Sequence, residues 1–135
     1  MKMINKEELE RFDLVELEEI AYPDRLICYI GTRDMEFSKK FYEEKTGIPF
    51  ESADPEDDPS VGIEVSLEVE RQTGDIALFT IAIVTRDEYG SESSVEIRDI
   101  PFTEENVIYI LEKCGAEADL IKLVADKNGF RHVSR

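Results

Sequence analysis

The sequence predicts an α+β domain with a mostly antiparallel sheet and about three helices, and three observations lead to this class. Residues 62–72 alternate between apolar and polar side chains, as in a strand with one face on a core. Residues 76–84 are apolar on both faces, as in a central strand, and follow after only a short turn. Asp34 and Thr103 each precede an amphipathic segment and have side chains typical of helix N-caps.

Two further strands are predicted on either side of this pair. Turn chemistry at Tyr22–Arg25, with proline at its second position, precedes an apolar run over residues 26–30. A second turn over residues 89–91 precedes a strand near residues 94–100, which would complete an antiparallel meander.

The two capped helices have predicted ends as well as starts. The helix that Asp34 opens runs over residues 34–46, and Gly47 is placed to end it in the left-handed conformation. The helix that Thr103 opens buries one apolar stripe and ends at Gly115. A shorter first helix is indicated by Asn5 and Glu8, which have the spacing of a capping box.

Two segments fit more than one structure. Residues 14–21 could extend the first helix, which is expected to reach about Phe12, or form a strand. Residues 118–134 carry an apolar set that suits a helix, yet Asn128–Gly129 is a typical two-residue hairpin turn. We favour the hairpin.

One domain is predicted over residues 1–135. At this length, and with 41% hydrophobic residues, the chain can bury a core without disulfides or metals. No repeat or Pro-rich linker divides it. Residues 25–134 are expected to form the core, with residues 1–22 as an N-terminal extension.

The net charge of −16 is the most informative property of the sequence. With 32 acidic against 16 basic residues, the chain lacks the basic footprint of a nucleic-acid-binding protein. Such a charge attracts a basic protein or a cationic small molecule, although acidity also serves solubility alone. Residues 1–70 hold 20 of the acids, and the candidate partner-binding residues lie there: Glu64, Glu68, Glu70, Asp54, Glu56, Asp57 and Asp58.

No pattern typical of catalysis or of a cofactor is found. The glycines do not form a phosphate loop, and the acidic loop lacks the glycine and glutamate of a calcium-binding loop. His132 is the only histidine, and Cys28 and Cys114 are far apart in the sequence without metal-ligand spacing, so both are expected to be reduced structural cysteines. Arg33 could hold an anion at a helix start, but pairing with a neighbouring acid is the favoured expectation.

The N-terminal segment lacks the apolar core of a signal peptide, and no stretch is long and apolar enough to span a membrane. A cytoplasmic location without membrane contact is therefore expected.

Residues 26–50 resemble the opening of the vicinal-oxygen-chelate superfamily, the glyoxalase and bleomycin-resistance group. The matching positions are Asp34, Ser38, Phe41, Tyr42 and Gly47. A fainter match runs over residues 95–133. The resemblance implies paired βαβββ modules around a cleft, but the first strand carries none of the family's metal ligands.

The expected function is that of a non-enzymatic acidic protein that binds a basic partner. One alternative is a metal-dependent enzyme of the vicinal-oxygen-chelate type, in which Glu64 and Glu96 would complete an atypical site. A second alternative is a structural or oligomer-forming module, such as a homodimer, which the apolar strand over residues 76–84 and the pairing implied by the family resemblance would support.

Overall fold

The computed structural model describes residues 3–18, 24–50, 60–87 and 89–130. The elements of these ranges, in chain order, are α1 (Lys6–Leu9), β1 (Leu14–Glu18), β2 (Arg25–Thr32), α2 (Met35–Thr46), β3 (Ser60–Glu70), β4 (Ile76–Arg86), β5 (Glu92–Glu96), α3 (Glu104–Lys113) and α4 (Ala118–Lys127). The α+β class predicted from the sequence is confirmed.

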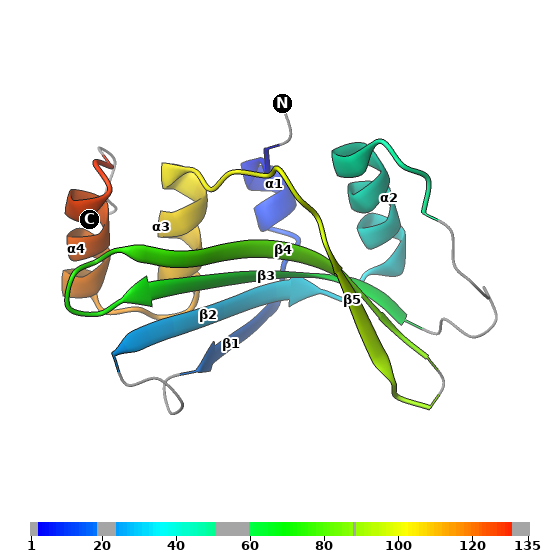
Figure 1. Cartoon of the computed structure of the whole chain (residues 1–135), viewed down its shortest axis with the longest axis horizontal. Helices are drawn as coiled ribbons and strands as arrows, with labels where there is room; N and C mark the ends of the chain where they lie inside the picture. Colours follow the sequence, from blue (N-terminus) through cyan, green and yellow to red (C-terminus); the bar gives the residue numbers. More distant parts are fainter. Residues whose placement is uncertain (1–2, 19–23, 51–59, 88, 131–135) are drawn as a thin grey trace.

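The described strands form one sheet in the order β1-β2-β3-β4-β5, and every neighbouring pair is antiparallel. The long central pair, β3 and β4, lies side by side across the middle of the molecule (Figure 1). A bulge between Glu68 and Val69 shifts the register near the end of this pair. The strand expected near residues 94–100 begins and ends earlier than predicted, at Glu92–Glu96.

All four described helices lie on the same side of the sheet, so the described elements cover one of its faces and leave the other uncovered (Figure 1). The odd-numbered residues of β3 from 61 to 69 point to the helices and are fully or almost fully buried. They pack with apolar side chains of β2, β4, α3 and α4 into one core. The alternation that predicted this strand therefore marks the boundary between core and uncovered face.

Residues 4–18 belong to the same core and sheet. Phe12 is fully buried, and its ring packs edge-on against Phe37 and Phe41 of α2 at centroid distances of 5.8 and 6.0 Å. Residues 14–18 pair with β2, which settles the choice between helix and strand for this part of the segment. Residues 19–21 lie outside the described ranges.

The capping signals of the sequence are confirmed. The Asn5 side chain accepts from the Glu8 amide, and the Glu8 carboxylate accepts from the Asn5 amide, which makes a capping box. Asp34 accepts from the Phe37 amide at the start of α2, and Gly47 ends that helix with a φ of 72°.

The hairpin expected over residues 118–134 is wrong for its described part, because residues 118–127 form α4. The helix buries one stripe made of Leu120, Ile121, Val124 and Ala125. Asn128 ends the helix instead of making a hairpin turn, and its side chain donates to the carbonyls of Gly74 and Val124. Burial of this stripe on the core has prevailed over a local turn signal.

The helix α4 also bears on the expectation of paired βαβββ modules, because a second module would need strands in that part of the chain. The elements β2, α2, β3, β4 and β5 follow the order of one such module. Two helices, α3 and α4, follow β5, so the described residues form one sheet instead of two modules around a cleft. Within those residues, no helix is long and apolar enough to cross a bilayer.

Candidate functional site

The uncovered sheet face brings together the acidic residues that the sequence placed on one side of β3. Glu64, Glu68 and Glu70 all project from this face, opposite Gly31, Ile27 and Arg25 of β2. These three of the seven predicted binding residues therefore lie on a common surface. The other four, Asp54, Glu56, Asp57 and Asp58, lie outside the described residues.

A pocket of about 260 Å³ opens on this face where β1, β2, β3 and the ends of β4 and β5 meet. Its floor contains Gly31 of β2 and Gly62 of β3. A Cβ at position 31 would lie 2.6 Å from the Ile63 carbonyl oxygen, and one at position 62 would lie 2.5 Å from the Thr32 carbonyl oxygen. Only glycine allows the two strands to approach this closely, and the missing side chains leave the hollow open.

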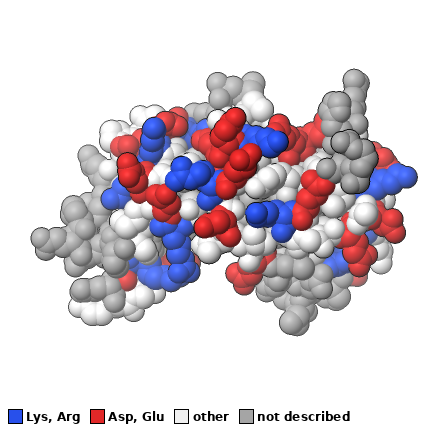
Figure 2. Space-filling model, turned by 180° about the vertical axis from the view of Figure 1, so that it is seen from behind, with Lys and Arg blue, Asp and Glu red and all other residues white. Residues whose placement is uncertain are grey.

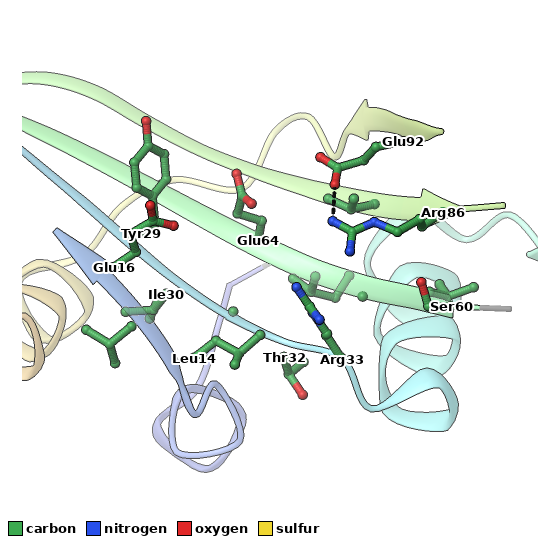
Figure 3. A pocket seen from close by; sticks show the side chains of 16 residues that line it. Leu14, Glu16, Tyr29, Ile30, Thr32, Arg33, Ser60, Glu64, Arg86 and Glu92 are labelled. Atoms are coloured by element: carbon green, nitrogen blue, oxygen red, sulfur yellow. Dashed lines mark hydrogen bonds and ion pairs between the residues drawn. The ribbon is translucent and has the colours of Figure 1, made fainter. Parts of the chain in front are cut away.

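Charged side chains surround the pocket. Figure 3 shows Glu16 toward one end, Arg86 and Glu92 toward the other, and Glu64 and Arg33 between them. Arg86 and Glu92 form an ion pair of 2.6 Å. Within the described ranges, Glu16, Glu64 and Arg33 have no ion pair, so their charges remain available to a partner.

Glu64 has the most perturbed carboxyl group of the pocket. Its pKa is raised from the ordinary value of 4.5, first because the pocket walls reduce its hydration, and then because Glu92 and Glu16 are also negative. By area the side chain is exposed, so the hydration loss is partial and the direction of the shift is the firm conclusion. Ionisation of Glu64 therefore costs more free energy than ionisation of a fully hydrated glutamate, and a nearby cation would reduce that cost.

Glu68 and Glu70 differ from Glu64 because both form ion pairs with Arg25, which neutralises part of their charge. The Arg25 Nε lies 3.0 Å from Glu70 Oε1, and its Nη1 lies 3.3 Å from Glu68 Oε1. These carboxylates raise the pKa of Arg25, Glu70 by its charge first and then Glu68 by its hydrogen bond. Of the predicted trio, Glu68 and Glu70 are thus paired with Arg25, whereas Glu64 has no ion pair within the described residues.

Sequence reasoning missed Glu16, Glu92 and the two floor glycines. Glu16 lies in the segment over residues 14–21 that fitted either a helix or a strand, so the sequence did not predict on which side of the sheet its side chain would lie. Glu92 belongs to a strand whose start was expected two residues later. Both could have been placed on this face by alternation alone, had the strand boundaries been known.

One side of the molecule carries a mixture of acidic and basic side chains. Figure 2 shows acidic and basic side chains interspersed over the view from behind Figure 1. The ion pair favoured for Arg33 is not formed within the described ranges; instead this exposed side chain points into the pocket (Figure 3).

The described residues offer little for metal chemistry. Among them, no group of three or more His, Cys, Asp or Glu side chains could hold a metal ion. Glu64 and Glu96, proposed as ligands in the enzymatic alternative, lie on the same face but on either side of Ala82, one strand apart from each other. His132 lies outside the described residues.

Comparisons with protein-family models, with curated proteins and with solved structures found no match. The resemblance to the vicinal-oxygen-chelate superfamily therefore stays a prediction. What the fold and the site define is an α+β protein with an uncovered antiparallel sheet face and a charged, glycine-floored pocket on it.

Proposed function

We propose that this protein is a non-enzymatic binding protein that holds a basic protein partner on the uncovered face of its sheet. The main observation behind the proposal is that Glu64 places an unpaired negative charge in the pocket on this face. Its carboxylate has no ion pair within the described residues, and its pKa is raised by lost hydration and by two neighbouring carboxylates. The positive charge of an arginine or lysine side chain from a partner would offset both the lost hydration of Glu64 and its repulsion by the neighbouring carboxylates. The same side chain would form a charge-assisted hydrogen bond with the Glu64 carboxylate.

The shape of the site favours a protein over a small molecule as the partner. The pocket of about 260 Å³ is smaller than the ~300–1,000 Å³ typical of small-molecule sites, and it lies open on a sheet. It suits one inserted side chain. Further carboxylates lie beyond it on the same face, at Glu68, Glu70 and Glu96, where only an extended partner surface would reach them.

The overall charge supports the same type of partner. A net charge of −16 raises the local concentration of cationic molecules and accelerates their approach. Beyond a Debye length of about 8 Å at physiological ionic strength, this attraction is screened, so the rate of association should fall with added salt. Arg33 adds selectivity, because a partner with an acidic group opposite it would be preferred over a uniformly basic one.

A binding measurement with a defined probe tests the proposal. The probe is an arginine-rich peptide, titrated by calorimetry against the native protein and against the double variant Glu16→Gln/Glu64→Gln. The variant should bind at least tenfold more weakly, which corresponds to about 1.4 kcal/mol.

The matched control is Glu112→Gln/Glu117→Gln. It removes the same number of charges from exposed positions of the helix layer, at the end of α3 and at the start of α4. Its affinity should stay within about twofold of the native protein. An equal loss in both variants would mean that the peptide responds to net charge alone, and the proposed site would be rejected.

A further inference from the structure

The strand β1 forms one margin of the sheet (Figure 1). It pairs with β2 on one side, and no strand among the described residues pairs with its other side. The free side of an edge strand presents backbone N–H and C=O groups to which an extended segment of another chain can bind as an additional strand. In an antiparallel sheet, successive residues of a strand turn these groups to opposite sides.

The register of the sheet shows which residues of β1 turn their backbone groups outward. The Asp24 carbonyl, one residue before β2, accepts from the Arg71 amide, one residue after β3, at 2.9 Å. Even-numbered residues of β2 therefore direct their backbone groups to β3, and odd-numbered residues direct theirs to β1. These odd-numbered residues pair with even-numbered residues of β1. The N–H and C=O groups of Val15 and Leu17 consequently point away from the sheet.

The side chains of this edge differ between the two faces of the sheet. Glu16 lies on the uncovered face, where it lines the pocket (Figure 3). Val15 pairs with Ile30, which is buried in the core, so the Val15 side chain lies on the covered side, where it is still 43% exposed. A strand added at this edge would thus have a carboxylate beside it on one face and an accessible apolar side chain on the other.

We propose that the basic partner binds through an extended segment that adds to the outer edge of β1 as an antiparallel strand. This inference rests on the proposed function and specifies how the partner is held. The partner residues opposite Val15 and Leu17 exchange backbone hydrogen bonds with them and project to the covered side. The partner residue between these two is basic and lies opposite Glu16, at the margin of the pocket. The segment recognised at this edge therefore alternates between apolar and basic residues.

Charge favours a basic segment over a second copy of this chain. Two copies joined antiparallel at this edge, with Val15 of each bonded to Leu17 of the other, would set the two Glu16 side chains directly opposite each other. Like charges in that position destabilise a strand pair, whereas opposite charges stabilise it. The net charge of −16 on each chain adds to the repulsion.

Peptide binding to the full chain, measured by calorimetry, tests the backbone contacts. The probe is a blocked peptide in which valine and arginine alternate, and it is compared with two versions that carry N-methyl groups on all valines or on all arginines. N-methylation removes the N–H donor of a residue. The valines lie on the side of Val15 and donate to β1, so their methylation should weaken binding by about tenfold or more. The arginines lie opposite Glu16 and direct their N–H groups to solvent, so their methylation should change the affinity by less than about twofold.

A pair of proline variants shows where the peptide binds. Val15→Pro removes an outward N–H of β1 without removing a bond to β2, and proline is tolerated on the free side of an edge strand. Ser94→Pro is the matched control on the opposite edge. The Ile97 amide donates to the Ile81 carbonyl of β4, so Ser94, three residues earlier, turns its N–H away from β4. Val15→Pro should weaken binding of the unmethylated peptide by about tenfold, and Ser94→Pro should leave it within about twofold. If Val15→Pro does not fold, as judged by thermal unfolding, the methylated peptides decide.

The outcomes separate this inference from the proposed function. Equal affinities of the two methylated peptides, a larger loss on methylation of the arginines, or an equal loss in Ser94→Pro and Val15→Pro would reject strand addition at β1. The proposed function would stand in each of these cases if Glu16→Gln/Glu64→Gln still weakened binding of the unmethylated peptide. An unmethylated peptide that does not bind, or that binds this double variant as well as the native protein, would reject both.

Discussion

The Asp34 carboxylate links α2 to the segment that follows α1: one oxygen caps α2 by accepting from the Phe37 amide at 3.0 Å, and the other accepts from the Arg11 guanidinium at 2.7 Å. Arg11 follows α1 and also lies 4.8 Å from the centre of the Phe37 ring. A single side chain therefore both starts α2 and ties it to the N-terminal segment.

This double role predicts different effects of two substitutions at position 34. Asp34→Asn keeps a good capping group and loses the charge, while Asp34→Ala loses both. Asp34→Ala should therefore lower the midpoint of urea unfolding further than Asp34→Asn does. Equal effects would mean that only one of the two interactions matters.

The same residue predicts a pH dependence. The pKa of Asp34 is lowered from 3.8, first by the Phe37 amide and then by Arg11. Since its folded-state pKa lies below the unfolded value, its contribution to stability is present above about 3.8 and is lost as the pH falls through the folded-state pKa. The difference in stability between native protein and Asp34→Asn should accordingly shrink with acidification over that window. A constant difference would contradict the ion pair.

Phe12→Ala tests whether the N-terminal segment is part of the core. The ring is fully buried against two aromatic rings of α2, so its removal should lower the free energy of unfolding by about 3–5 kcal/mol. Chemical denaturation of the full chain measures this value. A loss below about 1 kcal/mol would show that residues 1–18 are a loosely attached extension.

Gly31→Ala should fill the pocket floor and strain the sheet. The new Cβ would meet the backbone carbonyl of Ile63 at 2.6 Å, and backbone cannot rotate away as a side chain can. The expected loss of stability is roughly 1–3 kcal/mol. Ser66→Ala, on the same face of β3, is the control, because it adds no atoms and should change stability little. Unchanged stability of Gly31→Ala would contradict the close approach of β2 and β3.

Glu64→Gln should stabilise the free protein slightly at neutral pH. The pKa of Glu64 in the folded state lies above the ordinary 4.5, so ionisation of the group costs stability as the pH rises from 4.5 through the folded-state pKa. The gain from the substitution should be roughly 0.5 kcal/mol or less, since solvent screens an exposed group, and it should disappear below about 4.5. Thermal unfolding at several pH values measures it. Destabilisation at neutral pH would mean that Glu64 has a favourable partner.

Much of the fold could be predicted from local signals. Alternation marked β3, capping residues marked α1, α2 and α3, and Gly47 marked the end of α2. These features depend on hydrogen bonds and side-chain directions within a few residues of each other, so they can be predicted from short stretches of sequence. The site could be predicted only in part: Glu64, Glu68 and Glu70 share a face because they share a strand.

Tertiary structure decided the features that short stretches of sequence could not predict, namely the structure of residues 118–127 and the contacts between distant elements. Residues 118–127 became a helix because Val124 and Ala125 could be buried against the core, and that gain exceeded the turn preference of Asn128–Gly129. Glu16 and Glu92 reached the pocket only through the pairing of β1 with β2 and of β4 with β5. The sequence by itself determined the charge, the class and the faces of single elements. Which elements became neighbours was decided by the core that buries them together, because contacts between residues distant in the chain depend on the packing of the whole fold.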